Sequence, residues 1–101
     1  MIDRITKNEE RLDSALKVVK ELEIALENFK ENQKNIKLVS KYYGSKNWFK
    51  DKEYYEQGKI SKIKAGVLSE DTVWNMLEDI KELTREMQII INNQNNNYIL
   101  N

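Results

Sequence analysis

The chain has 101 residues, of which 34% are charged, and its 17 basic and 17 acidic side chains give a formal net charge of zero. It has no cysteine and no histidine, so disulfides, thiolate nucleophiles, the commonest general base and the commonest metal ligand are excluded. Proline is absent as well, so no helix interior is interrupted by a missing N–H. The length predicts one small domain.

An apolar repeat of seven runs through residues 1 to 43 and predicts one long amphipathic helix. Its two series are Ile5, Leu12, Val19 and Leu26, and Ala15, Leu22, Phe29, Ile36 and Tyr43, with Leu16 and Val39 beside them. Gln33 interrupts the first series between Asn32 and Asn35, and this is where we expect any bend. Gly44 is expected to end the helix, because a positive φ carries no Cβ penalty at glycine.

A short second helix is predicted between the first two glycines. Ser45 or Asn47 can cap its start, Trp48 lies in its first turn, and Gly58 is expected to stop it. Residues 59 to 68 then form a connector that is too apolar for a free linker, so we expect it to pack across the other helices.

The start of the last helix is the sharpest local signal in the chain. Ser69 can accept a hydrogen bond from a backbone N–H of the first turn, and Glu70 and Asp71 place negative charge at the positive end of the helix dipole. Leu68 and Val73 stand at the two positions of a hydrophobic staple. A helix should therefore begin at Glu70.

That last helix is predicted to run to about Ile91, with Trp74 beginning the face that packs toward Tyr43 and Trp48. The Asn-rich segment 92–101 is expected to be a frayed tail. The predicted fold is therefore all-α, with a long N-terminal, a short middle and a C-terminal helix forming an antiparallel three-helix bundle within a single domain, residues 1–91.

Two motifs carry a family resemblance. The first is Tyr42, Tyr43, Gly44, Ser45, Trp48 and Asp51, and the second is Gly66, Val67, Leu68, Ser69, Glu70 and Asp71. Together they resemble the small bacterial family catalogued as domain of unknown function 4298, over roughly residues 4 to 88. The chain departs from that family in having no proline in the connector and Ala65 directly before Gly66. The resemblance implies a helical fold and a bacterial source, and it brings no activity with it.

The aromatic segment allows two interpretations. Six of the nine aromatic residues lie between Tyr42 and Tyr55, interleaved with lysines, and residues 30–64 carry ten lysines against four acids. Such a segment can stack bases and neutralise phosphates. Alternatively, Tyr43, Trp48 and Tyr55 form a second core layer that lysine stems cover. We favour the core interpretation, because short helices need large side chains to stay docked and the segment has no arginine for base or phosphate contacts.

The polar motif residues have structural interpretations. Asp51 is expected to accept a hydrogen bond from a nearby tyrosine hydroxyl or from the Trp48 ring N–H. Ser45 and Ser69 are better caps than nucleophiles, since no histidine can activate them. We therefore predict no catalytic, cofactor-binding or metal-binding residues.

The length of the first helix is the main indication of function. Its partners in the chain are too short to cover it, so part of its apolar stripe should need another surface. We expect that surface to include Leu12, Leu16, Val19 and Leu22. The sequence thus predicts a non-enzymatic protein–protein interaction or self-association module, whose partner is an unknown protein or another copy of the chain. The alternative is weak nucleic-acid binding through residues 30–64. No apolar run is long enough to span a membrane and no signal-peptide pattern follows Ile2, so a cytoplasmic location is expected.

Overall fold

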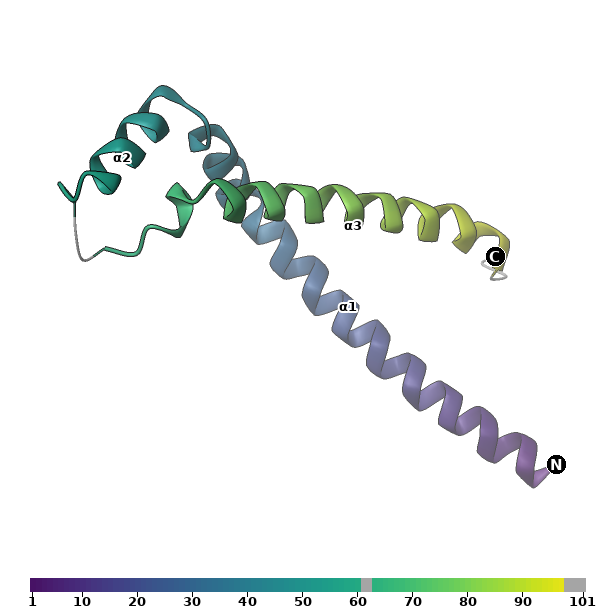
Figure 1. The fold of residues 1–101 in the computed structure, drawn as a ribbon. Helices are drawn as coiled ribbons and strands as arrows, with labels where there is room; N and C mark the ends of the chain where they lie inside the picture. The colour runs from purple at the N-terminus through teal and green to yellow at the C-terminus, as the bar shows by residue number, and fades with distance from the viewer. Residues whose placement is uncertain (61–62, 98–101) are drawn as a thin grey trace. The chain divides into compact units, whose positions relative to one another are not determined.

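The computed structural model describes residues 1–60 and 63–97, with the side chains described as far as Gln94. Its helices are α1 (Ile2–Tyr42), α2 (Lys46–Glu56) and α3 (Glu70–Asn97), and a short 3-10 helix, η1 (Gly66–Leu68), precedes α3 (Figure 1). Within these described residues there is no strand, so the predicted all-α class is confirmed. The chain divides into two compact units, residues 1–37 and 38–101.

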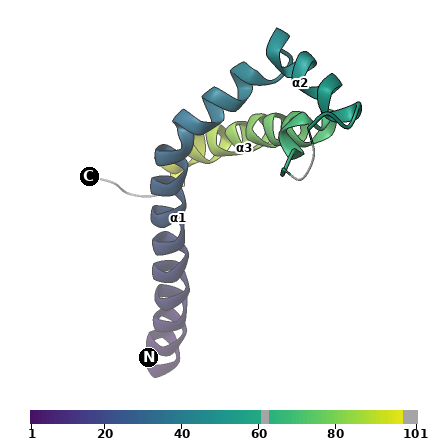
Figure 2. The same ribbon diagram turned by 90° about the vertical axis from the view of Figure 1, so that its left-hand side faces the viewer.

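The first unit holds residues 2–37 of α1 and no other helix. The helix continues without a break through Gln33, where the sequence left a bend open, and Figure 2 shows the α1 ribbon uninterrupted up to the turn before α2. The amides there bond within the helix: Asn32 Nδ2 donates to the Asn28 carbonyl (3.0 Å), and Asn35 Nδ2 donates to Asn32 Oδ1 (3.2 Å). The interruption in the apolar series therefore leaves the helical backbone intact.

Glycine and serine set the helix boundaries in the second unit, as the sequence predicts. Gly44 and Gly58 adopt positive φ values of 76° and 74° directly after α1 and α2. Ser45 caps α2 by accepting a hydrogen bond from the Trp48 N–H at 3.2 Å. Ser69 does the same for α3, accepting from the Asp71 N–H at 3.3 Å. These local signals work because each needs only a residue and its near neighbours.

The end of α3 differs from the expectation. The helix continues past Ile91 to Asn97, because no glycine or proline stands there to stop it. Gln88 Nε2 donates to Asn92 Oδ1 (3.1 Å), a side-chain contact one turn apart. Residues 98–101 of the predicted tail lie outside the described residues.

The core of the second unit is small and lies where η1 meets α2 and α3. Its buried side chains are Trp48, Leu68 and Val73. Leu68 and Val73 are the predicted staple pair, and their burial fits that role. Tyr43 adds an edge-to-face contact with Trp48, with ring centroids 5.1 Å apart.

The prediction for Trp74 is wrong. Its side chain is 55% exposed, whereas that of Val73 is 4% exposed. Neighbouring residues point about 100° apart around a helix. Because the staple turns Val73 inward, Trp74 is turned away from the Tyr43 and Trp48 layer.

Candidate functional site at the motif corner

Two hydrogen bonds join the two sequence motifs into one corner of the second unit, which we call the motif corner (residues 42–52 and 66–71). The Trp48 Nε1–H donates to the Val67 carbonyl at 2.9 Å. The Tyr43 hydroxyl donates to the Glu70 carbonyl at 2.8 Å. Segments far apart in sequence are thus tied through backbone carbonyls, which accept hydrogen bonds whatever the side chain at that position.

Tyr42 and Asp51 form a further hydrogen bond, across the turn between α1 and α2. The Tyr42 hydroxyl donates to Asp51 Oδ2 at 2.6 Å, and both residues are partly buried. Desolvation, followed by the hydrogen bond to and the negative charge of Asp51, raises the pKa of Tyr42 to about 12. The expected tie from Asp51 to a tyrosine hydroxyl is therefore confirmed. Asp51 stabilises the protonated phenol at neutral pH.

Lys52 is the residue of this corner that sequence reasoning missed. Its ammonium lies 2.8 Å from Glu70 Oε1 and 3.7 Å from Glu56 Oε1, and 5.3 Å from the centroid of the Trp48 ring. The hydrogen bond with Glu70 raises the pKa of Lys52 and lowers that of Glu70. The signal was present in part, because Lys52 stands four residues after Trp48 and four before Glu56, on the same face of α2.

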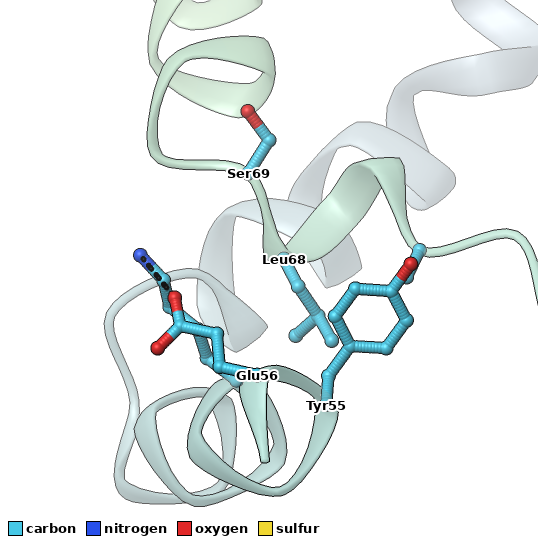
Figure 3. A pocket seen from close by; sticks show the side chains of 6 residues that line it. Tyr55, Glu56, Leu68 and Ser69 are labelled. Atoms are coloured by element: carbon cyan, nitrogen blue, oxygen red, sulfur yellow. Dashed lines mark ion pairs between the residues drawn. The ribbon is translucent and has the colours of Figure 1, made fainter. Parts of the chain in front are cut away.

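A hollow of about 270 Å³ lies beside the corner. It is lined by Lys52, Tyr55, Glu56, Ala65, Leu68 and Ser69. Figure 3 shows the Tyr55 ring beside Leu68, the ion pair at Glu56, and the Ser69 hydroxyl directed away from both. Its lysine is already paired with two carboxylates, and its serine oxygen accepts the helix-capping hydrogen bond. These polar groups are held by structural contacts.

A second hollow, of about 370 Å³, also borders η1 and is mainly apolar. Its lining is Val39, Lys64, Gly66, Val67, Thr72, Val73 and Met76. No cluster of acidic side chains with a metal-binding arrangement is found in the described part of the chain. Among the same residues, no helix is long and apolar enough to cross a bilayer.

The aromatic segment divides between core and surface. Trp48 is buried, whereas Phe49 is 60% exposed. The ammonium groups of Lys50 and Lys59 lie 5.9 Å and 5.1 Å from the centroid of the Tyr54 ring. The core interpretation therefore holds for Trp48 and in part for Tyr43, but it is wrong for Tyr55, which is 39% exposed. An exposed basic and aromatic surface remains beside Trp48.

The four predicted interaction residues belong to the first unit, and the motif corner belongs to the second. Leu12, Leu16, Val19 and Leu22, which we call the interaction row, lie in the first unit and are 50%, 59%, 62% and 57% exposed. A unit that is one helix has no second element of its own to cover such a row. The row is therefore a separate candidate surface.

Comparison with known proteins decides the family. The family model "Domain of unknown function (DUF4298)" matches residues 5–90, a span that holds the heptad stripe and both motifs. The chain belongs to the DUF4298 family. No curated protein and no solved structure matches the chain. The resemblance seen in the two motifs is thus confirmed, and the family description carries no function.

Proposed function

We propose that this DUF4298 chain is a non-enzymatic protein–protein interaction module that binds a partner helix through the interaction row. The single observation that carries the proposal is the exposure of these four large aliphatic side chains along one side of a one-helix unit. Contiguous exposed apolar surface of this kind marks interaction sites in soluble proteins. A helix that is apolar on one side also gains most of its stability from packing.

The size of the row limits the partner. Burying an aliphatic side chain fully stabilises by about 1.5–3 kcal/mol, so covering the exposed half of four such residues gives roughly 3–7 kcal/mol. Association costs about 4–15 kcal/mol in lost freedom. Burying the interaction row alone does not fully offset this cost of association. The partner must therefore also cover Ile5 and Leu26, which are 57% and 45% exposed on the same stripe. The proposed partner is therefore a long helix.

The bundle expected from the sequence belongs to this proposal. The exposed apolar side chains of α3, among them Leu83, Met87 and Ile90, can pack antiparallel on one edge of the stripe of α1. The stripe is wide enough for two neighbours, because Leu16 lies on one side of the heptad series and Val18 and Ala25 on the other. We therefore expect α3 to take the edge at Val18 and Ala25, and the partner to take the rest of the stripe, including Leu16.

The non-enzymatic part of the proposal is supported by the motif corner. Tyr42, Tyr43, Asp51 and Lys52 are engaged with one another or with α3, and Ser69 caps α3. These side chains therefore make structural contacts. We assign the motif corner the role of stabilising the second unit.

Cysteine reactivity tests the proposal. The chain has no cysteine, so Leu16→Cys introduces a unique thiol in the row, and Ile24→Cys, 53% exposed and on the far side of the helix, is the matched control. In dilute protein with the mass of one chain, both thiols should be alkylated at similar rates. At least tenfold slower reaction at position 16 would show that the chain covers its own row, and the proposal would fail.

Weak nucleic-acid binding through residues 30–64 is a second candidate. Its support is the exposed Phe49 and the two ammonium groups over the Tyr54 ring. It predicts that a single-stranded oligonucleotide is retained at low salt and released as salt rises. Lys50→Ala with Lys59→Ala should reduce retention, and an absence of retention at low salt would dismiss this candidate.

A further inference from the structure

We propose that the partner of the interaction row is a second copy of this chain, lying antiparallel so that Val19 of one copy meets Leu22 of the other. This inference rests on the proposed function. It adds the identity of the partner, the direction in which the partner's helix runs, and the residues that face each other. A two-fold pair requires a self-complementary surface, in which residue i meets j and j meets i. The heptad stripe of α1 is self-complementary in one antiparallel register.

Between Ile5 and Ile36, every apolar core position meets an apolar one in this register. The layers are Ile5 with Ile36, Leu12 with Phe29, Ala15 with Leu26, and Val19 with Leu22, each pair occurring twice by symmetry. The two polar core positions of this span, Asn8 and Gln33, also fall opposite each other. A shift by one heptad in one direction sets Asn8 against Leu26, and in the other direction sets Gln33 against Ala15. Both shifts place a polar side chain against an apolar one.

Charges beside the core are favourable in the same register. Among the residues that flank the core, Glu9 of one copy lies beside Lys30 of the other, and Glu23 lies beside Leu16. A shift of one heptad in one direction sets Glu9 against Glu23, and a shift in the other direction sets Glu23 against itself while it sets Glu9 against Lys37. Like charges at these flanking positions disfavour a pairing. The charges therefore disfavour the first shift, and core matching disfavours both.

Side-chain size favours the antiparallel direction. In a parallel, in-register pair Ala15 would face Ala15 and Phe29 would face Phe29, so one layer would be underfilled and another overfilled. The antiparallel register sets Ala15 against Leu26 and Phe29 against Leu12. Each of these two layers then combines a smaller and a larger side chain, which suits close packing.

Disulfide trapping distinguishes the directions. Leu12→Cys and Phe29→Cys protein should be prepared separately and mixed in a glutathione redox buffer. The antiparallel pair predicts a disulfide between the two variants and at least tenfold less of either homodimer, because two Leu12→Cys thiols would lie roughly 25 Å apart along the axis. Ile24→Cys mixed with either variant is the control and should give no more disulfide than background.

Spin labels on the outer face keep the test valid if a core cysteine weakens the pair. Labels at Glu10→Cys should be separated along the axis by about 31 Å, and labels at Ile24→Cys by about 10 Å, whereas a parallel pair gives equal separations. A Leu12→Cys homodimer, or equal label distances, would overturn the antiparallel inference and leave the proposed function standing. A light-scattering mass of one chain for the natural sequence at all concentrations would overturn self-association, while the alkylation test decides the proposed function separately.

Discussion

Replacing Trp48 with phenylalanine tests whether the motif corner holds the second unit together. Trp48 is 4% exposed, and its ring N–H donates to the Val67 carbonyl at 2.9 Å. Losing that donor leaves the carbonyl without its partner, which costs about 1–3 kcal/mol when the group is buried. Val67 is only partly buried, so water replaces part of the bond, while the smaller ring loses about 1 kcal/mol of apolar burial. We expect Trp48→Phe to lower the free energy of unfolding by about 2 kcal/mol.

The matched control is Trp74→Phe, the same change at a tryptophan that is 55% exposed. It should shift stability by less than about 0.5 kcal/mol, the usual range for surface substitutions. Urea unfolding followed by circular dichroism at 222 nm measures both variants, and an unchanged slope would attribute the shift in midpoint to stability. Equal midpoints for Trp48→Phe and Trp74→Phe would refute the assignment of Trp48 as the centre of the corner.

Three further predictions concern the boundaries and the Tyr42 tie. Ser69→Ala should lower stability by about 1 kcal/mol through the lost cap and leave partner binding intact; lost binding at unchanged stability would contradict the capping role. Gly44→Ala should cost about 1–2 kcal/mol because its φ is 76°, whereas Gly66→Ala, where a Cβ has open space, should change stability by less than about 0.5 kcal/mol. Tyr42, with its pKa raised to about 12, favours the folded state below pH 10, and this contribution is lost between about pH 10 and 12. Urea titrations across that range should show a steeper loss for the natural chain than for Asp51→Asn, and identical curves would argue against the tie.

The boundaries of the helices were predictable because each depends on a few neighbouring residues. Gly44 and Gly58 end helices through their own φ, and Ser45 and Ser69 cap helices within three residues. The end of α3 was not predictable in the same way. A run of asparagines lowers helix propensity without stopping a helix, and α3 continues to Asn97.

The contacts of the motif corner lay beyond sequence reasoning because their partners are distant or have no side-chain signature. Trp48 is tied to a residue 19 positions away and Tyr43 to one 27 positions away, and both acceptors are backbone carbonyls. Lys52 pairs with Glu70 across 18 positions. The hydrogen bond from a tyrosine hydroxyl to Asp51 was predictable in kind, because a carboxylate among tyrosines needs a hydrogen-bond donor. Trp74 was assigned to the wrong side because the staple at Val73 sets the rotation of α3.

Light scattering over a concentration series shows most directly whether the interaction row binds a second copy of the chain. We expect the mass of the natural chain to rise from one chain toward two. Leu16→Glu should stay at one chain, and Ile24→Glu, with the same charge on the opposite side of α1, should follow the natural chain. A mass of one chain at every concentration would contradict self-association, and slow alkylation of Leu16→Cys in addition would show that the chain covers the row itself.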